Sequence, residues 1–251
     1  MDRLTDQDYW EKYYSKAITQ KSQISTVVSE YDKYWDILIN QNDNKEKKTI
    51  IELGGYPGRY LAYLADKYNL TPTCLDFNSD TIKIKESMTA FGIEDYKIIQ
   101  ADILNFIPTE KYDIVISNGF IEHFEDFKTV LNNHSNYLKK GGTMLVMIPN
   151  KRWLRKWYGY LVDYENLKAH NLRCMSKNTF KDFAQKNNLI LIENTFFGGF
   201  PFSVHQKLNF FQKIVYNATR AIFKKANPFL KRNPSAFYSS SLISIYKKNE
   251  D

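Results

Sequence analysis

Residues 49–60 read Thr-Ile-Ile-Glu-Leu-Gly-Gly-Tyr-Pro-Gly-Arg-Tyr, and this stretch decides the fold. A short apolar run ends at Gly54, and a helical pattern begins near Gly58 and continues to Tyr68. Glycines between a strand and a helix let backbone amides approach a ligand closely. The stretch therefore predicts a buried strand, a ligand-binding loop and a helix, in that order.

The same alternation of strand and helix continues along the chain. The further predicted strands are 72–76, 96–100, 112–117, 143–148, 189–195 and 237–247. The further predicted helices of this part are 79–91, 126–139 and 177–187. Gly141-Gly142 is expected to form a turn before the strand at 143–148. Such alternation forms a parallel sheet covered on both faces, so we expect an α/β, Rossmann-like, doubly wound fold.

One domain is expected over residues 1–251, because no linker separates a second hydrophobic core. Its parts are a helical cap (1–45), a core (49–148) and two insertions (150–175 and 197–236). Helical spacing marks the cap, with Tyr9, Trp10, Tyr13 and Tyr14 in a first helix and Ile24, Val28, Tyr31, Trp35 and Leu38 in a second. The insertions are expected to cover the sheet edge where ligands bind.

Positive charge is concentrated in one region. The formal net charge is +7, and between Lys151 and Arg232 there are 16 Lys or Arg residues against 4 Asp or Glu. A basic region attracts anionic partners such as phosphate, nucleic acid or an acidic lipid surface. A solvated basic face is the commoner explanation.

Neither disulfide bonds nor a membrane span is predicted. The two cysteines, Cys74 and Cys174, lie far apart without a partner motif, so a zinc site is not indicated either. Apolar runs are short, and no secretory signal is visible. A cytoplasmic location is expected, with the inner face of the membrane as a peripheral alternative.

Acidic residues follow successive predicted strands. Asp76 ends the strand at 72–76, about twenty residues after the glycines, where an acid accepts hydrogen bonds from both hydroxyls of a ribose. Asp102 follows the next strand and can accept from an adenine amino group. Taken singly, Asp76 could be a turn residue and Glu52 could cap the following helix. Together the three acids favour a nucleoside cofactor.

With these motifs, the central hundred residues resemble the class I S-adenosylmethionine-dependent methyltransferases, in particular bacterial enzymes of the type 11/12 group. The resemblance implies a seven-stranded, mostly parallel sheet with an antiparallel last strand. It also implies S-adenosylmethionine as cofactor and S-adenosylhomocysteine as product. A dinucleotide dehydrogenase is the nearest rival, but Tyr56 breaks the G-x-G-x-x-G pattern of such enzymes.

The resemblance implies how the first loop meets the cofactor. Glu52 would meet the amino end of the methionine moiety, directly or through water. The loop itself contributes Gly54, Gly55, Tyr56 and Gly58. Tyr56 stands where the family usually has a glycine, so either the loop is displaced there or Tyr56 covers the cofactor.

The resemblance also places the nucleoside and the sulfonium. Asp76 would hold the ribose, and Phe77 would pack on the adenine. Asp102 and Ile103 would frame the adenine edge. Beside the methyl-bearing sulfonium would lie the pair Asn118 and Gly119.

His123 is the candidate catalytic base, because it follows the fourth strand near the methyl group and could titrate near neutrality. A packing role under the next helix is the alternative. Some relatives carry Glu-x-x-Glu-His here and bind a divalent metal, but Gly119 replaces the first acid, so no metal is predicted. Asn118-Gly119-Phe120 also differs from the Asn-Pro-Pro-aromatic motif of enzymes that methylate base nitrogens. We expect O-methylation of a small-molecule or sugar- or lipid-linked acceptor.

The acceptor site is expected between the cap and the insertions, with Tyr13, Tyr14 and Trp153 as candidate contacts. A basic helix is predicted at 206–226. Its apolar face is formed by Leu208, Phe211, Val215, Ala218 and Ile222, with Phe210 and Phe223 near the edges. Such a helix could lie on an anionic membrane or pack on the sheet as a lid.

Two other functions stay open. An RNA methyltransferase could use basic charges within 151–232 as a phosphate track, with Trp153 and Trp157 as stacking platforms. No recognised RNA-binding appendage supports this reading, so a nucleic-acid partner is not expected. A non-catalytic module that binds the cofactor without turnover is the other alternative. The sequence does not indicate an oligomeric state.

Overall fold

A seven-stranded sheet is the centre of the computed structural model, which describes residues 2–15, 17–40 and 47–250. The strands are β1 (Thr49–Leu53), β2 (Thr71–Asp76), β3 (Lys97–Gln100), β4 (Tyr112–Asn118), β5 (Leu138–Pro149), β6 (Leu189–Phe197) and β7 (Ser241–Lys248). Their order is β3-β2-β1-β4-β5-β7-β6. β7 alone runs antiparallel to its neighbours, β5 and β6. The expected Rossmann-like sheet with an antiparallel last strand is confirmed.

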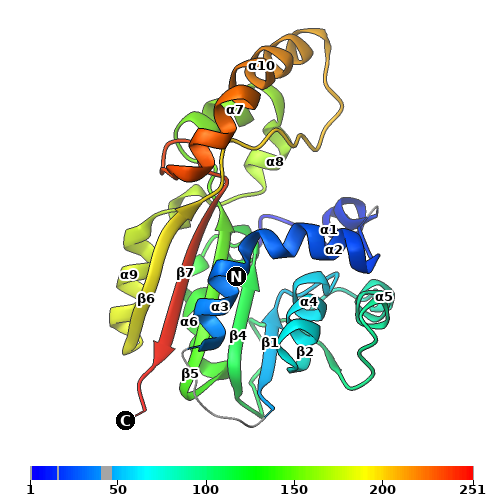
Figure 1. Ribbon diagram of the computed structural model, residues 1–251, viewed down its shortest axis with the longest axis vertical. Coiled ribbons are helices and arrows are strands. Elements are labelled where there is room, and N and C mark those ends of the chain that lie inside the picture. The colour runs from blue at the N-terminus through cyan, green and yellow to red at the C-terminus, as the bar shows by residue number, and fades with distance from the viewer. Residues whose placement is uncertain (1, 16, 41–46, 251) are drawn as a thin grey trace.

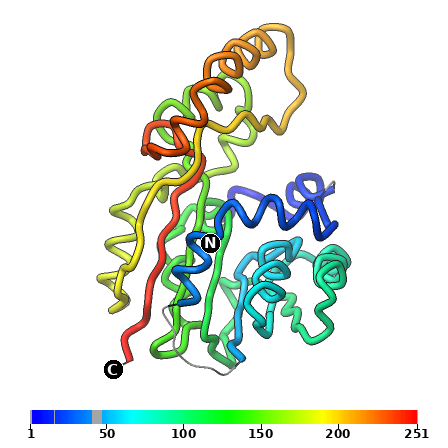
Figure 2. Tube along the Cα trace, in the orientation of Figure 1, coloured from blue at the N-terminus to red at the C-terminus, as the bar shows by residue number. Residues whose placement is uncertain are grey.

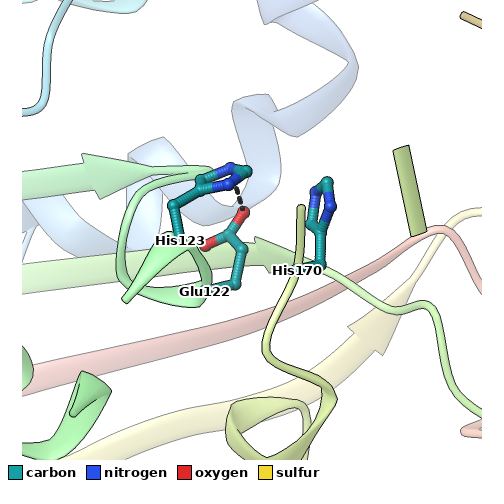
Figure 3. A group of neighbouring side chains, drawn as sticks. All are labelled: Glu122, His123 and His170. Atoms are coloured by element: carbon teal, nitrogen blue, oxygen red, sulfur yellow. Dashed lines mark ion pairs between the residues drawn. The ribbon is translucent and has the colours of Figure 1, made fainter. Parts of the chain in front are cut away.

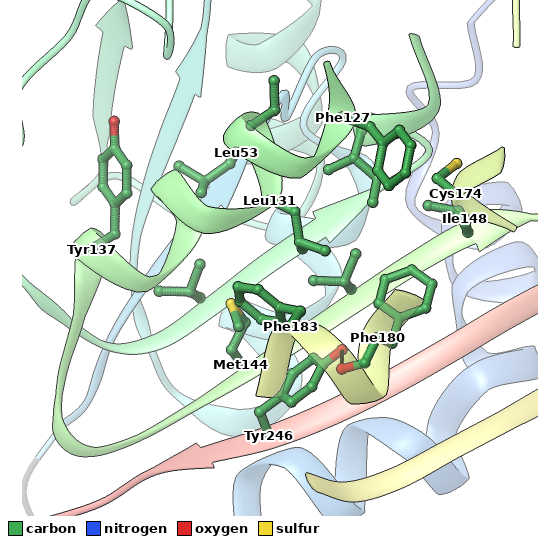
Figure 4. Packing of buried hydrophobic residues seen from close by; sticks show 14 of the residues in the cluster. Leu53, Phe127, Leu131, Tyr137, Met144, Ile148, Cys174, Phe180, Phe183 and Tyr246 are labelled. Carbon is green, nitrogen blue, oxygen red and sulfur yellow. Dashed lines mark hydrogen bonds between the residues drawn. The ribbon is translucent and has the colours of Figure 1, made fainter. Parts of the chain in front are cut away.

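Helices cover both faces of the sheet (Figures 1 and 2). One face is covered by α2 (Lys21–Val28), α3 (Asp32–Asn40), α4 (Arg59–Tyr68) and α5 (Ile82–Ala90). The other face is covered by α6 (Phe127–His134) and α9 (Lys177–Lys186). Figure 4 shows Phe127 of α6 and Phe180 and Phe183 of α9 over the sheet, with Phe183 beside Met144. Because both faces are covered, the middle of each central strand consists of fully buried β-branched apolar residues: Ile50 and Ile51 in β1, and Ile114, Val115 and Ile116 in β4.

Several predicted boundaries were wrong. The second cap helix is divided into α2 and α3 by a 3₁₀ turn, η1 (Ser29–Tyr31), and residues 41–45 of the predicted cap lie outside the described residues. The helix predicted at 126–139 ends at His134 and continues as a 3₁₀ turn, η3 (Ser135–Tyr137). Gly141-Gly142 lies inside β5 instead of forming a turn, because Leu138 already pairs with Tyr112 of β4.

The last strand also begins later than predicted. Residues 237–240 are not part of β7, because Ser239 donates its backbone N–H to Ser235 in a turn before Ser241. The other core strands and helices begin and end within three residues of their predicted limits.

The two insertions, residues 150–175 and 197–236, form one compact unit that we call the cover. Its helices are α7 (Leu154–Val162), α8 (Tyr164–Lys168) and α10 (Phe210–Arg232), with a 3₁₀ turn, η4 (Leu172–Cys174). Figure 1 shows these three helices beyond the end of the sheet toward which β4 points. The cover has its own small core, in which Phe223 of α10 stacks on Phe200 and Tyr158 of α7 meets Phe200 edge-on. The first helix of the cap, α1 (Gln7–Tyr14), lies at the same end of the sheet.

α10 begins and ends later than the predicted 206–226, and only part of the predicted face packs against the cover. The side chains that contact α7 and its neighbours include Val215, Tyr216 and Phe223. On the predicted face, Phe211 is 76% exposed and Ile222 is 66% exposed. The reason is that α10 packs on one side only, so the rest of its apolar surface faces outward. Among the residues that the structure describes, no helix is both long and apolar enough to cross a membrane.

Candidate active site

A cleft opens at the carboxyl ends of the parallel strands, between the sheet, α1 and the cover. Its floor includes Glu52, near the end of β1, and Asn118, the last residue of β4. Tyr13 and Tyr14 of α1 form part of one wall, and Asp163 of the cover lies opposite. This is the edge at which doubly wound sheets bind ligands, as the sequence analysis expected.

Glu52 and Asn118 form a buried polar pair at the bottom of the cleft. Asn118 Nδ2 donates to Glu52 Oε1 at 2.8 Å. Glu52 Oε2 and Asn118 Oδ1 are buried without a hydrogen-bond partner. Burial raises the pKa of Glu52 to about 8. The pair therefore presents two unsatisfied acceptors, which suits a ligand that carries an ammonium group.

The glycine-rich loop is held tightly against β2. The N–H groups of Gly54 and Gly55 donate to the Leu75 carbonyl at 2.9 and 3.3 Å, so these amides are not free to bind a ligand. Gly54 has a φ of +69°, and a Cβ there would lie 2.2 Å from the Phe120 ring. Gly54 is therefore required because the loop packs closely on Phe120. Its amide does not serve to bind a ligand.

Tyr56 folds back toward the start of α5. Its hydroxyl donates to Asp80 Oδ2 at 3.0 Å, and its ring meets Tyr14 edge-on at 5.3 Å. The side chain lines the cleft floor next to Gly55. Gly58 has a φ of +85° and precedes α4, where a residue with a Cβ would contact Ile84.

A smaller hollow beside the cleft is lined by Asp76 and Phe77, two of the four residues predicted for the nucleoside. Asp76 accepts hydrogen bonds from the N–H groups of Tyr56 (3.0 Å) and Asn78 (2.8 Å), so it also has the turn role considered as an alternative. Ile103 is buried in the adjoining core.

The N-terminal segment covers this hollow. Arg3 forms an ion pair with Asp102, and its guanidinium lies 4.3 Å from the centre of the Phe77 ring. A backbone bridge between Arg3 and Phe124, and a hydrogen bond from Leu4 N to the His123 carbonyl, fix the segment in place. Arg3 belongs to no local motif, so its position could not be predicted from the sequence.

His123 lies in a polar group with Glu122 and His170 (Figure 3). Glu122 and His123 belong to a 3₁₀ turn after β4, η2 (Ile121–His123). Burial lowers the pKa of His123 to about 3, so the expectation that it titrates near neutrality is wrong. Burial also raises the pKa of Glu122 to about 8, and both of its carboxylate oxygens lack a hydrogen-bond partner. His170 was missed because it follows His123 by 47 residues and belongs to no local motif.

Two cations of the cover also line the cleft and were not predicted. Lys151 is only 8% exposed, and burial, followed by the nearby Arg155, lowers its pKa to about 7. Arg155 donates to the carbonyls of Asn150 and Ser240 at 2.9 and 3.2 Å. Their positions come from the fold of the cover, since nothing in the local sequence distinguishes them from surface cations.

The predicted acceptor contacts are only partly brought together. Tyr13 and Tyr14 line the cleft, and the Tyr13 hydroxyl lies 3.4 Å from His205 Nε2. Asp163 accepts from the backbone N–H of His205 at 3.0 Å, which ties the two insertions of the cover together. Trp153 is 55% exposed and lines a separate surface hollow with Trp157, outside the cleft.

Known proteins resemble this chain in sequence and in fold. A malonyl-[acyl-carrier protein] O-methyltransferase of Ilyobacter polytropus is 29% identical over 105 residues, which are 41% of this chain and 40% of that protein. The chain thus spans two fifths of the length of this relative. A SAM-dependent methyltransferase of Archaeoglobus fulgidus has a TM-score of 0.58 at 17% identity, covering 90% of this chain and 94% of that one.

A second solved structure is coclaurine N-methyltransferase bound to N-methylheliamine and SAH, with a TM-score of 0.55 at 14% identity. The superposed part covers 86% of this chain and 72% of the N-methyltransferase chain. At these identities, the structural likenesses establish the fold. The model of the methyltransferase domain family matches residues 28–194, which include the sheet from β1 to β5 and the cleft residues Glu52, Asn118 and His170. The chain therefore belongs to the methyltransferase domain family.

Proposed function

We propose that the protein transfers the methyl group of S-adenosylmethionine to an oxygen of a small-molecule or sugar- or lipid-linked acceptor. The observation that carries the proposal is the buried pair of Glu52 and Asn118, whose two unsatisfied acceptors suit the ammonium of the methionine moiety. The family to which residues 28–194 belong supports the same cofactor.

The other cofactor contacts follow the strand ends. Asp76 would accept from the ribose hydroxyls, and Phe77 with Ile103 would pack against the adenine, whose amino group would donate to Asp102. Gly119 would let the sulfonium lie against the backbone after β4. The nearest atom that a Cβ at Gly119 would meet is Glu122 Oε1, at 3.6 Å, so the methyl group would point toward the acceptor side of the cleft.

In the reaction, an acceptor oxygen attacks the methyl carbon, the carbon–sulfur bond breaks, and its electrons stay on sulfur to give S-adenosylhomocysteine. The main task of the protein is to hold the two reactants in line. His123 would receive the acceptor proton through Nε2, because its Nδ1 already bonds to the Ala169 carbonyl at 2.7 Å. A histidine whose pKa is about 3 is a weak base, so a hydroxyl acceptor needs further activation.

The cover presents a surface suited to an anionic membrane, which would bring a lipid-linked acceptor to the cleft. Its exposed large apolar side chains are Trp153, Trp157, Tyr160, Leu161, Tyr164, Phe210, Phe211, Ile214, Ile222 and Phe229. Basic residues of α7 and α10, such as Lys156 and Lys224, lie among them. Aromatic and apolar groups mixed with lysines are typical of interfacial helices. The protein would then act at the inner face of the membrane.

Methyl transfer is tested with S-adenosylmethionine that carries a labelled methyl group, incubated with cell extract and the purified protein. We expect label in the lipid or small-molecule fraction, and much less with Asp76→Ala when S-adenosylmethionine is not saturating. Label in RNA would favour the RNA alternative, and cofactor binding without label in any fraction would favour a non-catalytic module. A protein that does not bind S-adenosylmethionine would overturn the proposal.

Membrane contact is tested by co-sedimentation with vesicles that contain anionic lipid. We expect binding at low salt, and its loss in the triple variant Trp157→Ser, Phe211→Ser, Ile222→Ser. The matched control is Ile107→Ser, because Ile107 is 83% exposed but lies far along the chain from the cover, between β3 and β4. Binding that is unchanged in the triple variant, or absent at low salt, would remove the membrane contact.

A further inference from the structure

Three side chains on the acceptor side of the cleft carry lone pairs toward one another. Glu122 and His123 come from η2, and His170 comes from the cover. One ligand atom of each, a carboxylate oxygen and two imidazole nitrogens, lies within 4.8 Å of the other two. Figure 3 shows the Glu122 carboxylate between the two rings.

The tautomers of both histidines follow from their backbone contacts. Nδ1 of His123 lies 2.7 Å from the Ala169 carbonyl, and Nδ1 of His170 lies 2.6 Å from the Asn166 carbonyl. A carbonyl oxygen can only accept, so each Nδ1 carries the hydrogen and each Nε2 carries a lone pair. Nε2 of His123 is 3.7 Å from Glu122 Oε1. With Glu122 ionised, the group consists of acceptors that face one another without a donor.

Burying such a group costs free energy unless its members share a positively charged partner. Glu122 has no exposed surface, and neither of its oxygens has a hydrogen-bond partner. Buried acceptors that lack partners are rare in native proteins and call for a bound species. A cation held jointly by the carboxylate and the two Nε2 atoms would satisfy all three side chains.

We infer that Glu122, His123 and His170 bind a divalent transition-metal ion. Two neutral imidazoles and one carboxylate suit Zn²⁺, Fe²⁺ or Mn²⁺, whereas Mg²⁺ and Ca²⁺ prefer oxygen ligands. Backbone carbonyls that hold each Nδ1–H are the usual outer partners of metal-binding histidines. In a tetrahedral zinc site, ligand atoms are roughly 3.4 Å apart for bonds of about 2.1 Å, so small side-chain rotations would close the site.

The inference deepens the proposed function and rests on it for its chemical meaning. All three residues line the cleft, so a fourth metal position would face the acceptor. A hydroxyl bound there would release its proton to solvent near neutral pH, which removes the need for a strong base. With its Nε2 lone pair on the metal, His123 would not receive that proton, so the metal site replaces the base role proposed for His123. The expectation that no metal binds rested only on the local motif, in which Gly119 replaces the first acid. His170 lies outside that motif and joins the group through the fold of the cover.

Lys151 offers a competing explanation. It lines the same cleft and interacts electrostatically with Glu122, so its ammonium could serve as the counter-charge. The two explanations differ in a measurable way: only a metal site needs both histidines.

The test is metal binding by the whole protein, purified without a histidine tag and treated with a chelator. The protein is then equilibrated with Zn²⁺, Mn²⁺ or Co²⁺ in turn, and metal per chain is measured by mass spectrometry. We expect about one ion per chain, and visible absorption bands of bound Co²⁺. His170→Ala and the nearly isosteric Glu122→Gln should each bind metal at least about tenfold more weakly.

His205→Ala is the matched control, because this histidine lines the same cleft outside the group, and it should bind metal like the wild type. S-adenosylmethionine affinity and circular dichroism of each variant report that the fold is intact. A wild-type protein that binds cofactor but no stoichiometric metal would overturn the inference and leave the proposed function standing. Variants that bind metal like the wild type would overturn it equally.

Discussion

The two sides of the cleft are built in different ways. The cofactor side, residues 49–60, 76–80, 102–103 and 118–119, consists of short loops at the ends of parallel strands, and backbone contacts fix it. The acceptor side consists of side chains from η2, α1 and the cover, which are far apart in sequence. The difference teaches that cofactor binding depends on backbone geometry that few substitutions preserve. The cover has its own small core and can change without disturbing the sheet.

The largest expected difference between the two sides concerns their glycines. Gly54→Ala would place a Cβ 2.2 Å from the Phe120 ring at a φ of +69°, so we expect a loss of about 3 kcal/mol in the free energy of unfolding. Cofactor binding should be lost as well. Gly159→Ala in α7 is the matched control, because its Cβ meets Leu167 at an ordinary 3.4 Å and alanine favours helices. Urea denaturation checks both, and equal losses would contradict the comparison.

Cofactor affinity should separate the two sides next. Asp76→Ala removes the ribose acceptor, and we expect S-adenosylmethionine to bind about 10- to 100-fold more weakly, as for a lost hydrogen bond to a charged group. Trp157→Ala in the cover should change the affinity less than twofold, because Trp157 is 70% exposed and lies outside the cleft. Calorimetric titration measures both. Wild-type affinity in Asp76→Ala would show that the ribose is held elsewhere.

We expect acid to lower the free energy of unfolding by protonating buried histidines. Burial lowers the pKa of His134, the last residue of α6, to about 4, below the ordinary value of 6.5. Its contribution to stability is therefore present above pH 6.5 and is lost as the pH falls toward 4. Glu52 and Glu122 act in the opposite sense, because their raised pKa values favour the fold as the pH falls from 8 to about 4.5.

The variant His134→Gln isolates this effect, since glutamine does not titrate. Between pH 6.5 and pH 4, its free energy of unfolding should fall less than that of the wild type, by about 1 to 3 kcal/mol. Urea denaturation at several pH values measures the slope. The same slope in both proteins would mean that His134 is not kept neutral by the fold.

The smallest expected effect concerns the N-terminal segment. Arg3 contacts both Phe77 and Asp102, the residues proposed for the adenine. Arg3→Ala removes a competitor for these residues, so we expect S-adenosylmethionine to bind about threefold more tightly, a change of about 0.7 kcal/mol. Lys12→Ala, an exposed change in α1, should have no effect. Weaker binding in Arg3→Ala would instead make Arg3 part of the cofactor site.

The sequence predicted the strands and loops at the floor of the cleft far better than the residues that the cover brings to it, for a physical reason. Strand, glycine loop and strand-end acid are local patterns with fixed periods, so Glu52, Gly54 and Asp76 could be recognised in order. His170 and Lys151 reach the cleft only because the cover folds over the sheet, which no local pattern records. Trp153 was predicted for the acceptor site because it belongs to an insertion expected to wall that site. It lies outside the cleft.

The prediction of the packed face of α10 was partly wrong for a related reason. Its apolar residues lie nearly all around the helix, so periodicity could not show which side packs. The contact with Phe200 selects Phe223 and leaves Phe211 exposed. Gly141-Gly142 was taken for a turn because glycine pairs usually form one, whereas the pairing of Leu138 with β4 extends the strand through them.

Hydrogen–deuterium exchange with and without S-adenosylmethionine tests the central claim most directly, because it reports on both sides of the cleft in one measurement. The account predicts that the cofactor slows exchange at 52–60, 76–80 and 118–123, and leaves the outward part of α10 unchanged. Exchange that is unaltered at 52–60 and 76–80, or slowed only in the cover, would contradict it.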